Sequence, residues 1–201
     1  QEIVDVEERL AEIVRRTAER GGKVIIPAFS VGRSQEIVYQ LSELINAGEI
    51  PDLPIYIDSP LTVKASKIFA EHDECFDAET REILARGDDP FGFDRMNYIT
   101  DVEDSKALNR HRGACVIISA SGMAEAGRIL HHLRNNLGST DNTVLIVGFM
   151  AAHTLGRRLE EGRSPVRILG REVAVHAEVH GLHAFSAHAD RRDLLEFVKS
   201  M

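Results

Sequence analysis

The residues best suited to chemistry lie near the end of the chain, in the segment HAFSAHAD at residues 183–190. It holds His183 and His188 around a serine, and imidazole is the side chain that most readily exchanges protons or binds metals near neutral pH. The chain ends soon afterwards with no evident partner for these groups. The sequence therefore raises the question of where the rest of such a site lies.

Zinc binding is one chemistry that histidines could provide. Four of them fall in one short stretch: His176, His180, His183 and His188. However, no H-x-H, H-E-x-x-H or cysteine pair accompanies them, and strand alternation places His176 and His180 on one face and His183 on the other. The two cysteines, Cys75 and Cys115, are far apart, which disfavours a disulfide framework and a thiolate zinc site and fits a reducing compartment. We expect no zinc site made wholly within this chain.

A second group of polar residues follows the apolar runs of the sequence. These residues are Ser30, Arg33, Ser59, Ser121, Arg128, Thr154 and Arg157. Hydroxyls, loop amides and guanidinium groups donate hydrogen bonds to phosphate oxygens, so together these residues predict an anionic ligand. Each has an ordinary alternative role, because Ser and Thr cap helices and Arg33 could pair with Glu36. For Asp58 we expect a capping role, and of the adjacent His131 and His132 we expect one to face solvent.

The elements that would position these residues alternate between strand and helix. Buried strands are expected in five apolar runs, KVIIPAF, PIYID, MNYIT, ACVIISA and TVLIVGF, with helical periodicity between them. This alternation predicts an α/β fold, with a mainly parallel sheet flanked by helices on both faces. Residues 27–29, Asp58, Ser119 and residues 148–149 should then end neighbouring strands on one edge. A hairpin or an extension of the sheet is expected around residues 170–171, and a last helix at residues 191–199.

Composition excludes several classes of protein. The 201 residues are 43% hydrophobic and 28% charged, which is ordinary for a globular domain. The absence of a long apolar run and the acidic first residues predict no membrane partner and a cytoplasmic location. No G-x-S-x-G elbow, Walker loop or G-x-G-x-x-G is present, which weakens hydrolase-triad, NTPase and dinucleotide interpretations. With 5% aromatic residues and a net charge of −8, nucleic-acid binding should be local, backbone-led and weakly sequence-specific.

Five segments, in the same order, resemble the β-CASP family of metallo-β-lactamase nucleases. They are GGKVIIPAFSVGRSQEIVYQL, PIYIDSPL, SASGMAEAGRILHHL, NTVLIVGFMAAHTLGRRL and FSAHAD, and they span nearly the whole chain. The family includes the endonuclease subunit that cleaves messenger-RNA 3′ ends. The resemblance implies a zinc-dependent ribonuclease whose β-CASP domain clamps RNA against a metallo-β-lactamase domain of the same chain.

The resemblance also implies roles for parts of this sequence. Residues 1–180 would form the β-CASP domain, and residues 181–201 would begin the returning metallo-β-lactamase segment. His188 would be catalytic, contacting the scissile phosphate or assisting the leaving group beside two zinc ions. The family's H-x-H-x-D-H ligand motif is missing here. We therefore expect this chain to be a piece of a longer enzyme and, alone, to hold no zinc and cut no RNA.

Two other classes of function stay open on the sequence alone. A non-catalytic phosphate- or nucleotide-binding α/β module would need the same strand-end loops but not His188. An interaction domain would use those loops only as helix caps. DNA is an alternative to RNA, since nothing in the sequence points to recognition of the 2′-hydroxyl.

Overall fold

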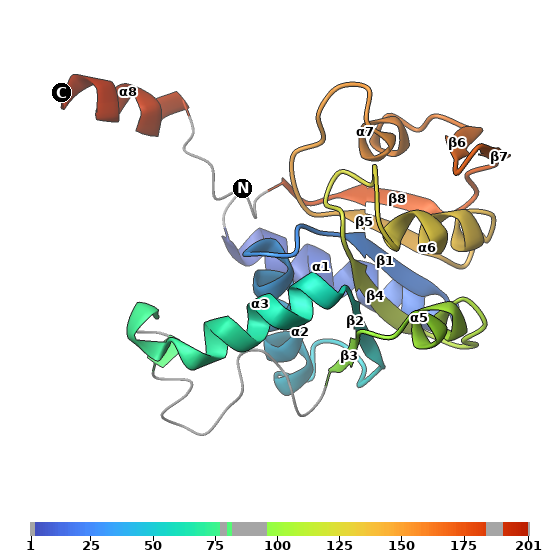
Figure 1. Ribbon diagram of the computed structural model, residues 1–201, viewed down its shortest axis with the longest axis horizontal. Coiled ribbons are helices and arrows are strands. Elements are labelled where there is room, and N and C mark those ends of the chain that lie inside the picture. Colours follow the sequence, from blue (N-terminus) through green and yellow to red (C-terminus); the bar gives the residue numbers. More distant parts are fainter. Residues whose placement is uncertain (1–2, 77–79, 82–95, 184–190, 201) are drawn as a thin grey trace.

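The computed structural model describes residues 3–76, 80–81, 96–183 and 191–200 (Figure 1). At its centre lies a six-stranded sheet in the order β3-β2-β4-β1-β5-β8, and every neighbouring pair is parallel. Its strands are β1 (Lys23–Pro27), β2 (Ile55–Asp58), β3 (Asn97–Ile99), β4 (Cys115–Ser119), β5 (Thr143–Ile146) and β8 (Glu178–Gly181). The predicted α/β fold with a mainly parallel sheet is confirmed.

Helices cover both faces of this sheet, as the strand and helix alternation predicted. The longer ones are α1 (Ile3–Glu19), α2 (Arg33–Asn46), α3 (Pro60–Glu71) and α6 (Ile129–Asn136), whereas α8 (Arg191–Lys199) stands apart from the sheet in Figure 1. The shorter ones are α5 (Val102–Leu108), α7 (Leu155–Glu160) and the 3₁₀ turn η1 (Asp73–Cys75). Helices α1 and α2 pack on one face and α6 and α7 on the other. None of the helices in the described ranges is both long and apolar enough to cross a membrane.

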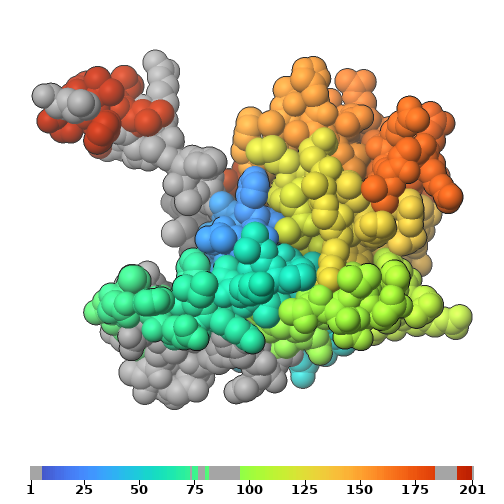
Figure 2. Space-filling view, in the orientation of Figure 1, coloured from blue at the N-terminus to red at the C-terminus, as the bar shows by residue number. Residues whose placement is uncertain are grey.

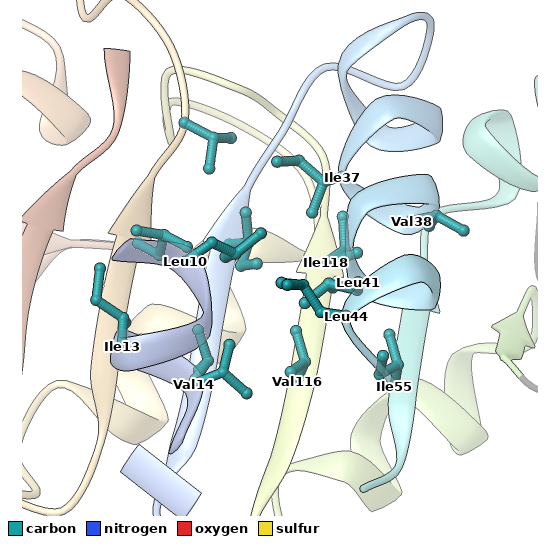
Figure 3. Close-up of a cluster of buried hydrophobic side chains, with 14 of the residues drawn as sticks. Leu10, Ile13, Val14, Ile37, Val38, Leu41, Leu44, Ile55, Val116 and Ile118 are labelled. Carbon is teal, nitrogen blue, oxygen red and sulfur yellow. The ribbon is translucent and has the colours of Figure 1, made fainter. Parts of the chain in front are cut away.

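The apolar runs are continuous because the central strands are buried on both sides. In β1, Val24 and Ile26 belong to the cluster under α1 and α2, whereas Ile25 belongs to the cluster under α6 and α7. Figure 3 shows the first cluster, in which side chains of α1 and α2 meet Val116 and Ile118 of β4. All five residues of β1 and of β4 are buried, so neither strand has a solvent face.

The carboxyl ends of the strands meet at one edge of the sheet, as predicted. Pro27 pairs with Ser119 in the register of β1 and β4, and Ile57 of β2 pairs with Ile118. The segments that follow β1 (blue), β2 (teal) and β4 (yellow) adjoin on the face shown in Figure 2. We call the loops after β1, β2, β4 and β5 at this edge the rim.

Between α7 and the end of the main sheet, the chain forms a small hairpin and then one more strand of that sheet. A two-stranded antiparallel hairpin, β6 (Val166–Ile168) and β7 (Arg171–Val173), turns at Gly170 as the alternating pattern predicted. Gly170 has a φ of 79°, which a residue without a Cβ adopts readily. The chain then returns to the main sheet as β8, which pairs with β5.

Candidate functional site

The rim is organised around the carboxylate of Asp58, the last residue of β2. The carboxylate is fully buried and surrounded by three hydrogen-bonding partners. Arg128 donates from Nη1 to Oδ1 at 2.6 Å, and Ser105 Oγ donates to Oδ2 at 2.5 Å. His132 Nε2 lies 2.6 Å from Oδ2. Strand β2, helix α5 and helix α6 with its N-cap are thereby tied together at one point.

Asp58 is held in its charged form by these partners. Burial alone would raise its pKa, but the hydrogen bonds from His132, Ser105 and Arg128 outweigh burial and lower the pKa below the usual value. The expected capping role of Asp58 is wrong. Its neighbour Ser59 is the N-cap of α3 and accepts from the backbone N–H of Thr62 at 3.2 Å. A side chain at the cap position points back to its own helix, whereas Asp58 points into the protein.

Arg128, at the end of the loop that follows β4, links this cluster to the segment that follows β3. Its Nη2 donates to the backbone oxygen of Thr100 at 2.7 Å, and 19% of its side chain is exposed. Within the loop, Ser121 Oγ accepts from the backbone N–H groups of Glu125 and Ala126 at 3.2 and 3.3 Å. The Glu125 carboxylate in turn accepts from the backbone N–H of Leu155, at the start of α7. The loops after β4 and β5 therefore form one connected unit.

The other predicted rim residues also make contacts within the chain. Ser30 Oγ lies 3.3 Å from Ser59 Oγ, which joins the loops after β1 and β2. Thr154 is the N-cap of α7 and accepts from the backbone N–H of Arg157 at 3.2 Å. The Arg157 guanidinium pairs with Glu161 at 2.8 Å, a contact that raises the pKa of Arg157 further. The structure thus brings the predicted loops together and gives each named side chain an intramolecular partner.

Arg33 pairs with Glu36 at 2.5 Å, which was the alternative expected for this arginine. The pair stands at the wall of the rim, with the Arg33 side chain largely covered and the Glu36 side chain partly exposed. Burial raises the pKa of Glu36, and the neighbouring Arg33 guanidinium partly opposes this rise. A donor group and an acceptor group therefore lie side by side at the start of α2.

Two pockets open at the rim, and sequence reasoning identified neither. The first, about 480 Å³, is lined by the segments after β1, β4 and β5 and by Arg33 and Glu36 of α2. The second, about 800 Å³, is lined by α7 and its flanking loops, with Arg157, Arg158 and Arg163 in its wall. Phe149 lines both pockets. The only sequence signal was a phenylalanine directly after two of the apolar runs, in PAF and VGF.

Two of the histidines at the end of the sheet each contact a different carboxylate. His180 Nε2 lies 3.0 Å from Glu178 Oε2, and His183 Nε2 lies 2.6 Å from Glu160 Oε1. His131 is exposed and His132 is buried, so one of the two adjacent histidines faces solvent as predicted. His188 lies outside the described residues. In the described ranges, no group of three or more His, Cys, Asp or Glu side chains is arranged to hold a metal ion.

This fold, a parallel sheet with polar loops at one edge, is the α/β architecture that the motifs indicated, and comparison with known proteins identifies its family. Residues 34–159 match the model of the Beta-Casp domain, and residues 172–201 match that of the Zn-dependent metallo-hydrolase RNA specificity domain. The chain belongs to the β-CASP family of metallo-β-lactamase-fold RNA nucleases.

Several curated relatives align over nearly all of this chain. Ribonuclease TTHA0252 of Thermus thermophilus is 38% identical over 188 residues, which cover 94% of this chain and 43% of that protein. Transcription termination factor FttA of Methanosarcina mazei is 34% identical, over 98% of this chain and 32% of that protein. An RNase J-like protein of Methanocaldococcus jannaschii is 32% identical, over 98% and 44%. The chain spans less than half the length of these relatives.

Proposed function

We propose that this chain is the RNA-binding β-CASP part of a ribonuclease that hydrolyses RNA phosphodiester bonds. The observation that carries the proposal is the rim, where hydroxyls, loop amides and arginines lie along one edge of a parallel sheet. In open α/β sheets ligands bind outside the carboxyl ends of the strands, which is this edge. Membership of the β-CASP family and relatives named ribonucleases support the same function.

We assign RNA phosphates to the rim residues that the sequence predicted: Ser30, Arg33, Ser59, Ser121, Arg128, Thr154 and Arg157. Their contacts within the chain fix the positions of the loops. Ser59 is buried, so it would act by holding its loop, whereas the residues that keep exposed surface and the neighbouring loop amides would face the RNA strand. Backbone phosphates carry no base information, so this part of the binding would be sequence-independent and sensitive to salt. The net charge of −8 does not oppose it, because salt screens charges beyond about 8 to 10 Å.

The catalytic part of the proposal concerns His188 and the end of the chain. We propose a β-CASP domain at residues 1–180 and a metallo-β-lactamase segment from residue 181, close to the end of β8 at Gly181, although the second family model already matches from residue 172. His188 would act on the reacting phosphate. The description of the second family model names zinc, but the described residues offer no fitting donor set, and no hydrolytic step is assigned to them.

The test of RNA binding is a charge reversal with a matched control. Arg157→Glu should weaken binding of a fluorescent single-stranded RNA and reduce the slope of log K against log salt by about 0.7 for each lost phosphate contact. Arg112→Glu, at an exposed arginine just before the amino end of β4 and thus at the opposite edge of the sheet, makes the same charge change away from the rim. Equal effects of the two variants would contradict a role for the rim, and a preference for free nucleotides over RNA would favour a nucleotide-binding module.

Cleavage is tested separately from binding. The 201-residue chain, incubated with labelled RNA and added zinc, should give no products on a denaturing gel. In a longer chain that includes the remaining family domain, His188→Ala should lower turnover by about 10²- to 10⁴-fold with little change in RNA affinity. Near-normal turnover together with a lower melting temperature would assign His188 to structure.

A further inference from the structure

The first rim pocket lies where the connections of the sheet change direction. β1 continues into α2 on one face, its neighbour β4 continues into α6 on the other face, and the pocket opens outside their carboxyl ends. Such a topological switch point is where open α/β sheets form ligand crevices. Phe29, Phe149 and the Arg33–Glu36 pair are the parts of its lining that could recognise a ligand.

Two phenylalanines of the crevice are unusually exposed. Phe29 is 49% exposed and Phe149 is 63% exposed, although large aromatic side chains are normally well covered. Gly122 contacts the Phe29 ring so closely that a Cβ there would lie 2.6 Å from a ring carbon. The ring is thus supported from one side by bare backbone while much of its surface stays open. Exposed aromatic faces of this kind are stacking platforms for nucleobases, whichever base is present.

The second rim pocket adds the positive charge that a nucleotide requires. Three arginines and one glutamate in its wall give a formal charge of +2. Glu161 is shared by Arg157 at 2.8 Å and Arg163 at 3.4 Å, and Arg158 donates to backbone oxygens, at 3.3 and 3.4 Å. One carboxylate is therefore shared by two guanidinium groups, Arg158 has no carboxylate partner within the described residues, and Arg163 is strongly exposed. Guanidinium groups with spare donors bind phosphate oxygens in pairs of hydrogen bonds.

We propose that the two adjoining pockets bind one nucleotide of the RNA strand, with its base in the Phe29–Phe149 crevice and its phosphate among the arginines of the second pocket. Phe149 lines both pockets, so it would lie between the base and the phosphate of the bound nucleotide. The Arg33–Glu36 pair offers one donor group and one acceptor group to the base edge. This inference rests on the proposed RNA-binding function and adds a base-recognition site to it.

A nucleotide fits these pockets better than an apolar peptide segment. The crevice, of about 480 Å³, presents two exposed aromatic rings, and the arginine pocket beside it carries the charge opposite to that of phosphate. A purely apolar occupant would cover the Arg33–Glu36 ion pair and the arginines of the second pocket without offering them any polar group, and removing charged groups from water without such compensation is unfavourable. An apolar protein segment is the alternative that the experiment distinguishes.

The experiment uses the 201-residue chain and two probes: an RNA pentamer and a strand of five abasic ribose phosphates, measured by titration calorimetry. Phe149→Leu keeps apolar volume and removes the ring, and Phe197→Leu on α8 is the matched control, with 65% exposure. We expect the RNA to bind about five-fold or more tightly than the abasic strand. Phe149→Leu should reduce that difference by weakening RNA binding more than abasic binding, whereas Phe197→Leu should change neither affinity.

Other outcomes overturn the proposal in different ways. Equal affinity of the two strands for the unaltered chain would exclude the base site while leaving the phosphate-binding rim intact. Absence of binding by both strands would overturn the proposed RNA-binding function as well. If Phe149→Leu lowers both affinities equally, or neither, the ring does not contact a base. Phe29→Leu repeats the test from the other side of the crevice, and circular dichroism confirms that each variant is folded.

Discussion

Replacing Asp58 with asparagine tests whether the rim depends on one buried charge. The substitution keeps the shape of the side chain and removes the negative charge from a fully buried position. The amide oxygen of the asparagine could still accept a hydrogen bond from Arg128, but its NH₂ group would face Ser105 or His132, where a carboxylate oxygen now accepts. The guanidinium of Arg128, 19% exposed, would lose its counter-charge.

The expected loss of folding stability in Asp58→Asn follows from the unpaired guanidinium of Arg128. Removing one partner of a buried ion pair destabilises a protein by about 3–5 kcal/mol, because the remaining charge stays poorly solvated. For a chain of this size each kcal/mol lowers the melting temperature by about 2–4 °C, so Asp58→Asn should lower it by about 6–20 °C. Partial exposure of Arg128 favours the lower part of this range, since water can reach the freed group.

The same carboxylate gives stability a defined dependence on pH. Its pKa is lower in the folded state than in the unfolded chain, so folding favours the ionised form. This contribution is complete above the ordinary aspartate pKa of about 3.9 and is lost as the pH falls through the lower folded value. The stability difference between the unaltered chain and Asp58→Asn should therefore be constant near neutral pH and shrink below about pH 4.

The assay is urea and thermal unfolding followed by circular dichroism. Asp101→Asn is the matched control, because Asp101 is the exposed N-cap of α5 and asparagine caps helices about equally well. The control should stay within about 0.5 kcal/mol of the unaltered chain. A loss of less than about 1 kcal/mol in Asp58→Asn would refute the reasoning, since it would mean that the buried carboxylate contributes no more than a neutral hydrogen bond.

Three further predictions concern other parts of the chain. Gly22→Ala should cost about 1–3 kcal/mol in urea unfolding, because the new Cβ would lie 1.8 Å from the Asp141 carbonyl oxygen, whereas Gly138→Ala, with nothing within 4 Å, should be nearly neutral. Iodoacetamide should modify exposed Cys75 in the folded chain and Cys115 only after unfolding, since burial raises the pKa of Cys115 to about 11; early labelling of both, seen by mass spectrometry, would contradict this. Elemental analysis after dialysis should find no stoichiometric zinc, and zinc that is retained and then disappears in a His180→Ala variant would contradict that expectation.

The sheet was predictable because each of its buried strands leaves a recognisable pattern in a few consecutive residues. A strand buried on both faces must be apolar at nearly every position, so β1, β4 and β5 stand out as continuous runs between helical patterns. The parallel arrangement then follows from the helices between them. The rim loops were predictable for the same reason, since parallel strands that alternate with helices all end at one edge.

The Asp58 cluster was not predictable, because its members are brought together only by the fold. Ser105, Arg128 and His132 lie 47, 70 and 74 residues from Asp58 in the sequence, and no motif spacing connects them. The crevice was missed for a different reason. A low aromatic content describes the whole chain, whereas Phe29 and Phe149 owe their exposed positions to where two strands end.

The buried carboxylate also changes where phosphate affinity should concentrate along the rim. Arg128 looks in the sequence like any arginine at the start of a helix, yet it already binds Asp58 and the Thr100 carbonyl, so most of its charge and two of its donors are committed. Arg158, by contrast, donates only weakly to backbone oxygens, and Arg163 shares the carboxylate of Glu161 with another arginine. A phosphate gains more from groups that keep spare donors and net charge. The cluster at Asp58 therefore holds the shape of the rim, and we expect the loop and helix after β5 to supply the larger share of its attraction for RNA.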